Sequence, residues 1–181
     1  MSLTSLITKL LLILLSLFKR GSNKSLLEAK DDIYDSLNVL KSKIKCERVI
    51  LIYTKNGSGR PSIGKQLSIT VNQESWDSDS GLTPLRKTWR DRSTDGPYVK
   101  LLLRLTKKGI LHVKTDEIQG ILRTVYESQG IQQSILAEVV TLDGHYNYLS
   151  CNYTSDKEIT EEDLLAVQNT AHRIRYIISG N

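Results

Sequence analysis

Cysteine and histidine are scarce in this sequence, which limits the chemistry that it can support. The two cysteines, Cys46 and Cys151, can form neither a disulfide framework nor a zinc site, so a reducing cytosol is the expected compartment. The three histidines are His112, His145 and His172. No pair of them has metal-ligand spacing, and no Ser-His-Asp or Cys-His arrangement is present. We therefore expect no metal, no cofactor and no enzymatic activity.

Two loops resemble nucleotide or metal sites, but each lacks a required residue. Gly59–Lys65 has the spacing of a P-loop, yet Gln66 stands where that motif needs a magnesium-binding hydroxyl. A strand is predicted to follow it, whereas a P-loop precedes a helix whose N-terminus faces the phosphates. Asp77–Gly81 resembles a calcium loop, but Thr88 occupies the position of the bidentate glutamate. We interpret these segments as a hairpin loop and a solvated turn.

The charge balance is mildly basic. Twenty-five Lys and Arg residues against 20 Asp and Glu residues give a formal net charge of +5. The charged fraction of 25% and the apolar fraction of 39% are ordinary for a soluble domain with a core. The excess of positive charge favours an anionic neighbour, such as a membrane face, a nucleic acid or a phosphorylated ligand. Alternatively, these basic residues simply form a solvated surface. Nucleic acid is not among the partners that we expect.

Residues 3–18 are strongly apolar and are predicted to form an N-terminal helix, in a segment that we bound at residues 1–21. Such a helix is about 24 Å long, a little short of the ~30 Å hydrocarbon core. Lys9 opposes insertion by about 2.5–3.5 kcal/mol, but eleven Leu, Ile and Phe residues return about 0.3–0.6 kcal/mol each. We therefore predict a membrane anchor, and Lys19 and Arg20 favour a cytoplasmic globular domain. The anchor residues are Leu10, Leu11, Leu12, Ile13, Leu14, Leu15, Leu17 and Phe18.

The same segment admits two other interpretations. Thr4, Ser5, Thr8, Lys9 and Ser16 share one sector of the helix, so the helix is partly amphipathic and could pack against protein in an assembly, such as a virion. A cleaved signal peptide is disfavoured, because basic residues follow the apolar run and no small-x-small cleavage site is present.

Residues 22–181 are predicted to form one α+β domain. Ser25 can cap a helix that runs to about residue 45, and the β-branched run 47–54 is typical of a buried strand. Alternating residues predict a second strand over 66–74. An irregular segment, 75–108, contains a short helix near 99–106. A third strand is expected over 110–114 and a helix over 116–128.

The C-terminal part is predicted to be a hairpin followed by a helix. Asp143-Gly144 is a strong turn signal between strands 131–142 and 145–154. A two-residue loop there would pair Val139 with Tyr148 and Leu136 with Cys151. Thr160 and the acidic residues after it then begin a final helix, whose apolar stripe extends to Ile178.

This order of elements, together with the first strand, resembles GAF-type sensor domains. In that strand an acidic residue, Arg and Val, here Glu47-Arg48-Val49, lead into an aromatic-ended run. The resemblance covers roughly residues 25–178. It extends to small GAF-like proteins of tailed bacteriophages, in which Asn-Gly follows the first strand, as at Asn56-Gly57. It implies a GAF-like central antiparallel sheet with helices on one face and a cover on the other.

In a GAF-like layout the irregular segment would cover a ligand cleft, which makes its basic and aromatic residues candidates for binding. Guanidinium groups beside an indole suit a phosphate or nucleotide, although the same residues could coat a surface loop. Tyrosines on one side of the hairpin would line the floor. The candidate site for a small anionic ligand comprises Trp89, Arg90, Arg92, Tyr146 and Tyr148.

The apolar stripes of the first and last helices are wider than one sheet face requires. They predict a homodimer or larger homo-oligomer through Leu37, Leu40, Ile44, Ile174 and Ile178. Alternatively, both stripes are ordinary core. The sequence as a whole predicts a non-catalytic, membrane-associated regulatory or interaction module. The alternative is a structural protein of a phage virion or its assembly.

Overall fold

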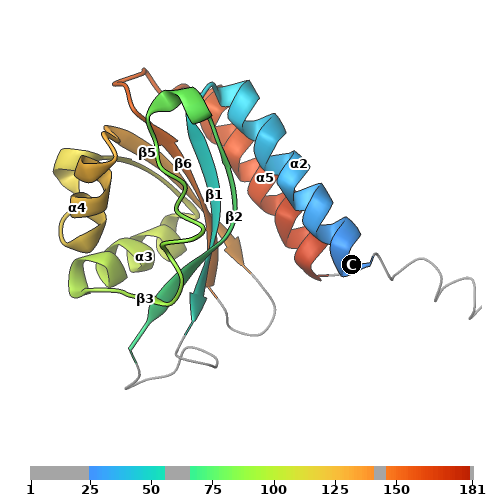
Figure 1. The fold of residues 1–181 in the computed structure, drawn as a ribbon, viewed down its shortest axis with the longest axis horizontal. Coiled ribbons are helices and arrows are strands. Elements are labelled where there is room, and N and C mark those ends of the chain that lie inside the picture. Colours follow the sequence, from blue (N-terminus) through green and yellow to red (C-terminus); the bar gives the residue numbers. More distant parts are fainter. Residues whose placement is uncertain (1–24, 56–65, 141–145, 180–181) are drawn as a thin grey trace, which may run out of the picture.

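The computed structural model describes residues 25–55, 66–140 and 146–179, which form an α+β fold around one antiparallel sheet (Figure 1). The six strands lie in the order β3-β2-β1-β6-β5-β4. Their bounds are β1 Arg48–Lys55, β2 Ser68–Trp76, β3 Arg92–Ser93, β4 Ile110–Lys114, β5 Gln133–Val140 and β6 Tyr146–Tyr153. The strands β1 and β6 are central, because their β-branched, aromatic and leucine side chains are buried on both faces of the sheet.

Two long helices cover one face of the sheet. They are α2, Leu26–Ile44, and α5, Glu161–Ser179, which lie side by side (Figure 1). Both begin at the predicted caps: Ser25 and Glu28 form a capping box, and the amide of Asp163 donates to Thr160 Oγ1. Their apolar stripes meet the inward residues of β1, β5 and β6 in one core cluster.

That packing decides between the two interpretations of the helical stripes. Leu37, Leu40, Ile44 and Ile174 are almost fully buried within a single chain, and Ile178 is partly buried against the same cluster. These side chains are therefore core, and the predicted dimer seam cannot be made from them while the domain stays folded. Self-association remains a prediction that would need other residues.

The opposite face carries two further helices, so helices lie on both faces rather than on one as predicted. These are α3, Gly96–Lys108, and α4, Ile121–Ser128. The predicted helix over 116–128 is divided, because Gly120 adopts φ 72° and ψ −151° between α4 and a short 3-10 turn, η2, Thr115–Glu117. A second 3-10 turn, η1, Ser78–Ser80, lies in residues 77–91, which we call the cover segment.

One carboxylate organises both helices of this face. Asp95 Oδ1 accepts the amide of Tyr98 at 2.9 Å, and its Oδ2 accepts the amide of Ile121 at 2.7 Å. It therefore caps the N-termini of α3 and α4 together. Asp95 is the reason that α3 begins three residues before the predicted start at 99.

The register of the β5–β6 hairpin differs by one residue from the prediction. Val139 pairs with Asn147, and Leu136 pairs with Ser150. Because Val140 pairs with Tyr146, five residues connect the strands instead of two. The one-residue shift places Val139 and Tyr148, which were predicted to share a face, on opposite faces of the sheet. Val139 joins the core under α2 and α5, whereas Tyr148 and Ser150 face α3 and α4. The turn itself, Asp143-Gly144, lies outside the described residues.

The predicted N-terminal helix, including the anchor residues 10–18, also lies outside the described residues, and so does the loop Gly59–Lys65. Across 25–55, 66–140 and 146–179, no helix is both long and apolar enough to span a bilayer. Membrane attachment through residues 3–18 thus remains a prediction from sequence.

Candidate ligand site between the sheet and the cover segment

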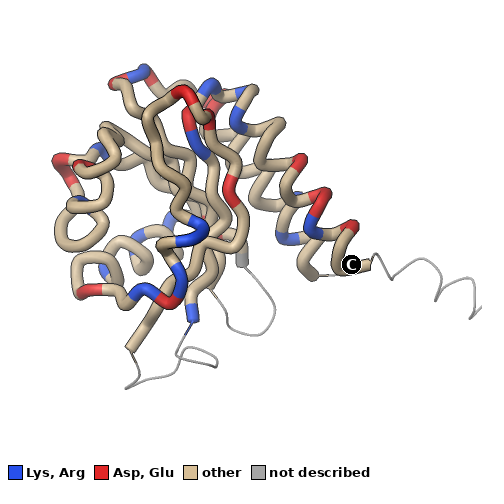
Figure 2. Tube along the Cα trace, in the orientation of Figure 1, with Lys and Arg blue, Asp and Glu red and all other residues tan. Residues whose placement is uncertain are grey.

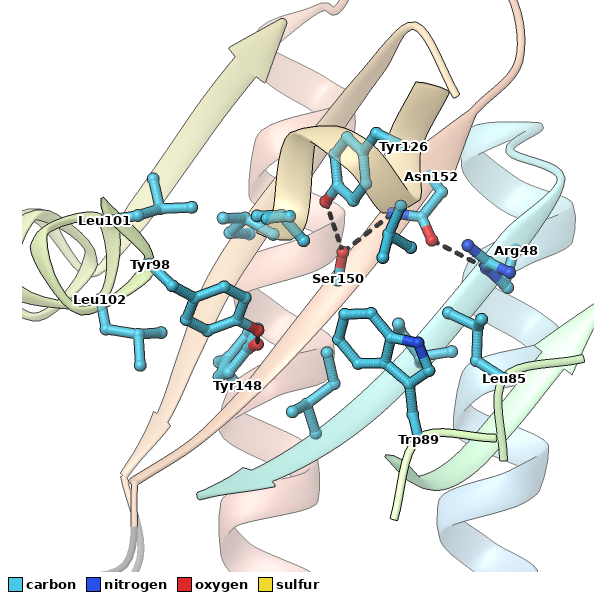
Figure 3. Close-up of a pocket in the computed structure, with 15 residues that line it drawn as sticks. Arg48, Leu85, Trp89, Tyr98, Leu101, Leu102, Tyr126, Tyr148, Ser150 and Asn152 are labelled. Atoms are coloured by element: carbon cyan, nitrogen blue, oxygen red, sulfur yellow. Dashed lines mark hydrogen bonds between the residues drawn. The ribbon is translucent and has the colours of Figure 1, made fainter. Parts of the chain in front are cut away.

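A small cavity lies between the sheet and the elements on its second face. It is lined from β1, β5 and β6 on one side and from the cover segment, α3 and α4 on the other (Figure 3). Its volume is about 10 Å³, which is room for roughly one water molecule. The interior is therefore closed in this state, with side chains where a larger ligand would lie.

One end of the cavity is aromatic and apolar. Trp89 reaches in from the cover segment and is only 5% exposed. The hydroxyl groups of Tyr98 on α3 and Tyr148 on β6 are hydrogen-bonded to each other (Figure 3). Burial raises the pKa of both tyrosines, so both remain neutral at physiological pH. This end offers flat apolar walls and a tyrosine pair that fixes α3 to the sheet.

The other end is polar and centres on Arg48, which is fully buried on β1. Its Nε donates to Asn152 Oδ1 at 2.8 Å, and Asn152 Nδ2 in turn donates to Ser150 Oγ at 2.9 Å. The hydroxyl of Tyr126 on α4 lies 3.5 Å from the same Ser150 oxygen (Figure 3). Residues far apart in sequence thus place several hydrogen-bond donors at one wall of an otherwise apolar space.

Arg48 also helps to hold the cover segment closed. Its Nη1 donates to the carbonyl of Thr83 at 3.2 Å and to Gln129 Oε1 at 3.3 Å, and it lies 3.8 Å from the carboxylate of Glu74. Burial lowers the pKa of Arg48, and the nearby Glu74 carboxylate opposes that shift. The guanidinium stays charged, because its normal pKa is far above neutrality.

Glu74, a buried residue on β2, makes the main attachment of the cover segment to the sheet. Its carboxylate oxygens accept the amide of Leu85 at 2.9 and 3.0 Å and the amide of Arg86 at 3.0 Å. Charge-assisted bonds of this kind are about twice as strong as neutral ones. Arg48 and Glu74 together form what we call the latch.

One donor of the latch is left over. Arg48 Nη2 is buried and has no hydrogen-bond partner in the part of the chain that the structure describes. An unmatched buried donor of this kind costs about 1–3 kcal/mol or more when charged, so proteins rarely retain one without a water or ligand partner. Since Arg48 lines the cavity, a group that enters the cavity can satisfy Nη2.

The predicted site residues divide into two groups. Trp89 and Tyr148 line the cavity together, on opposite walls. Tyr146 does not; its hydroxyl donates to Thr106 Oγ1 at the surface. Arg90 and Arg92 are exposed and are not among the residues that line the cavity, and Arg92 Nε donates to the carbonyl of Thr88. The structure therefore does not bring the two arginines to the interior.

The residues that sequence reasoning missed are Arg48, Glu74, Tyr98, Tyr126, Ser150 and Asn152. A usable signal was present at Arg48 and Glu74, because a charged residue inside a strongly apolar or alternating strand calls for a buried partner. The other four gave no signal, since strand and helix patterns do not reveal which polar residues share a cavity.

The cavity combines hydrogen-bonding groups with apolar walls, an arrangement that can bind a ligand. Ser150 bonds to an amide and lies beside a phenol, and no histidine or free carboxylate that could activate it lines the cavity. His112 bonds to Gln133 at the sheet edge, and His172 is exposed on α5. In the described ranges no three His, Cys, Asp or Glu residues cluster in a way that could hold a metal ion.

Comparison with known proteins supports the fold through structure alone. No protein-family model matches the sequence, and neither does any curated protein. The phycoerythrobilin-bound GAF domain from a cyanobacterial phytochrome is similar, with a TM-score of 0.62 and 16% identity over 85% of this chain and 87% of that chain. A far-red cyanobacteriochrome photoreceptor has a TM-score of 0.59 and 16% identity over 98% of this chain and 97% of that chain. A GAF domain/HD domain protein from Geobacter sulfurreducens has a TM-score of 0.59 and 11% identity over 84% of this chain and 92% of that chain.

Identities this low establish the architecture and nothing finer. The resemblance to small GAF-like proteins of tailed bacteriophages stays a prediction from the sequence. The chain has a GAF-like fold.

Proposed function

We propose that this chain is a non-catalytic regulatory module that senses a small ligand in the cavity beneath the cover segment. The observation that carries the proposal is the unmatched Arg48 Nη2 at the wall of an aromatic, closed cavity. One similar structure is a GAF domain with a bound phycoerythrobilin, which supports a ligand-binding role for this architecture.

The two ends of the cavity define the ligand. At the polar end, Arg48 Nη2 and the hydroxyls of Tyr126 and Ser150 suit a hydrogen-bond acceptor, such as a carboxylate or carbonyl oxygen. At the apolar end, Trp89 and the tyrosine pair suit a flat ring. The ligand class is thus a small aromatic or conjugated molecule with a carboxylate, which keeps the predicted anionic character but moves its contact from Arg90 and Arg92 to Arg48.

Binding has to open the cover segment, because a space of about 10 Å³ holds no more than about one water molecule. Trp89 is the largest movable side chain over the cavity. The amide bonds from Leu85 and Arg86 to Glu74 resist its displacement. The ligand would therefore favour an open state over the latched state, and the change at the cover segment is the signal that a partner could detect.

The test uses tryptophan fluorescence. Trp76 is 38% exposed and is not among the residues that line the cavity. Trp76→Phe leaves Trp89 as the sole tryptophan of the chain. Aromatic carboxylates and nucleotides are screened for a shift of Trp89 emission together with a rise in Tm. A ligand of the proposed class should do both, since displacement hydrates the indole and binding stabilises the folded state.

Three variants identify the contact. Arg48→Lys keeps the charge but removes Nη2, and Ser150→Ala removes one hydroxyl; each should weaken binding by about tenfold, equivalent to about 1.4 kcal/mol. Arg90→Ala, on the surface of the same segment, should leave binding unchanged. If binding is weakened by Arg90→Ala and not by the cavity variants, the site is on the surface. If no compound moves Trp89, the domain acts through its surface as a protein-binding or assembly module.

Membrane attachment through residues 3–18 is also part of the proposal, supported by the apolar run followed by Lys19 and Arg20. The full chain should remain with membranes after a high-salt wash, and a chain without residues 1–20 should not. A large ordered particle that forms without detergent would favour the assembly role instead.

A further inference from the structure

Charge is unevenly distributed over the described part of the chain. Residues 84–108 contain eight basic residues (Lys and Arg) and two acidic residues (Asp and Glu). The other described residues contain eleven basic and seventeen acidic residues. Figure 2 shows the basic residues along α3 and the chain that leads into it. All eight are exposed: Arg86, Lys87, Arg90, Arg92, Lys100, Arg104, Lys107 and Lys108.

These cations are not neutralised within the described domain. None of the eight forms an ion pair with a carboxylate in 25–55, 66–140 or 146–179. The two acidic residues of the segment are already engaged: Asp91 lies 3.5 Å from the ammonium of Lys55, and Asp95 caps two helices. Glu117 borders the groove beside Lys100, but it accepts the amide of Lys114. The segment therefore presents positive charge to its surroundings.

The exposed side of α3 adds an apolar residue to this charge. Leu101, Leu102 and Leu105 are buried against the sheet, but Leu103 is 57% exposed. On the helix surface Leu103 is adjacent to Lys100, three residues before it, and to Lys107, four residues after it. We call the set Arg90, Arg92, Lys100, Leu103, Arg104, Lys107 and Lys108 the basic face.

We propose that the basic face binds the surface of a membrane that contains anionic lipids. Each Lys or Arg near such a surface strengthens binding about fivefold, and an exposed leucine among cations can enter the boundary between headgroups and acyl chains. The residues that cover the cavity, Trp89 and Tyr98, share the same side of the sheet as the basic face. Membrane contact would thus be made beside the cover segment, which the proposed ligand has to move.

One observation and one prediction from the sequence favour lipid over nucleic acid as the anionic partner. Both aromatic residues of this segment are buried, so the face has no exposed ring on which a base could stack. The predicted anchor would also hold the domain on the cytoplasmic side, where anionic lipids are found. The inference does not rest on the proposed ligand, because no residue of the basic face lines the cavity.

The test is co-sedimentation of the full chain with vesicles of phosphatidylcholine alone or mixed with phosphatidylserine, at low and high salt. The apolar residues 3–18 bind both vesicle types, and Lys9, Lys19 and Arg20 add the same phosphatidylserine dependence to every variant. Differences between variants in the phosphatidylserine-dependent part therefore report the basic face. Lys100→Glu combined with Arg104→Glu should reduce that part by at least about 25-fold, two factors of about five. High salt should abolish it in the unaltered chain.

The matched control is Arg173→Glu combined with Arg175→Glu. This pair is exposed on α5, across the sheet, and makes the same change in net charge. It should lower binding much less. Leu103→Ser leaves the charge unchanged and should weaken binding at low salt, where the basic face contacts the vesicle, because its contribution is apolar.

Three results would overturn the proposal. The first is equal binding to both vesicle types, and the second is an equal loss in the two double variants. The third is a duplex RNA or DNA that binds through Lys100 and Arg104 while vesicles do not, which would assign the face to nucleic acid. Circular dichroism of each variant confirms that it is folded.

Discussion

Replacing Gly120 by alanine is expected to destabilise the domain by about 3–5 kcal/mol, although the residue is exposed and contributes no side chain. The reason is its position beside the carboxylate that caps α3 and α4. A Cβ on Gly120 would lie 2.0 Å from Asp95 Oδ2 and 2.7 Å from its Cγ. The side chain of Asp95 would have to leave, and both caps would be lost.

The magnitude has two parts. The backbone of Gly120, at φ 72° and ψ −151°, lies in a region that only glycine occupies readily, and a side chain there costs about 1–3 kcal/mol. Loss of the two bonds from Tyr98 and Ile121 to Asp95 costs about 1 kcal/mol each. Asp95→Ala alone should therefore cost about 2 kcal/mol.

A double-mutant cycle checks this reasoning. Urea denaturation of the full chain, followed by far-UV circular dichroism, gives the free energy of unfolding of each variant. When Asp95 is already alanine, Gly120→Ala has no carboxylate to expel, so it should cost only the strain of about 1–3 kcal/mol. The coupling energy is then about 2 kcal/mol. Strictly additive losses would show that the carboxylate and the glycine act independently, and the account would be wrong.

Two further predictions concern the first and last helices. Leu40→Glu buries a charge in the core and should lower the free energy of unfolding by more than about 4 kcal/mol. Val39→Glu, at an exposed position of the same helix, should change that free energy by less than about 0.5 kcal/mol. Light scattering that showed Leu40→Glu to be a folded monomer would instead restore the dimer seam. Burial alone would raise the pKa of Asp163, but the amide of Thr160 and the ammonium of Lys157 lower it overall. The stabilisation that Asp163 provides is therefore present at neutral pH and is lost as the pH falls through that lowered pKa, below about 4. In thermal unfolding, Tm of Asp163→Asn should depend less on pH than Tm of the unaltered chain. An equal pH dependence in the two proteins would show that Asp163 does not carry this effect.

Much of the fold could be predicted from the sequence, because helix and strand periodicity and capping are local properties. The helix over residues 25–45 was expected within one residue of α2, and 110–114 was predicted as it stands in β4. The cap at Thr160 was also correct. Local hydrogen bonds and alternation determine such elements whatever lies across the core.

The hairpin and the helical stripes show where local pattern fails. A strong turn signal fixed the existence of the β5–β6 pair but not its register, because register depends on which residues both core clusters accept. The stripes of α2 and α5 were read correctly as apolar, yet only packing shows that they cover each other and the sheet. An apolar stripe has the same sequence whether its partner lies in the same chain or in another.

The site depends almost entirely on tertiary structure. Sequence reasoning singled out Arg90 and Arg92, because basic residues are dense there and lie near Trp89 in the chain. The structure places those arginines outside and brings Arg48 together with Asn152, 104 residues away, inside. The pattern of the chain determined its strands, helices and caps, since these form between near neighbours. Only folding decided which charge is buried, because burial depends on partners that sequence distance does not reveal.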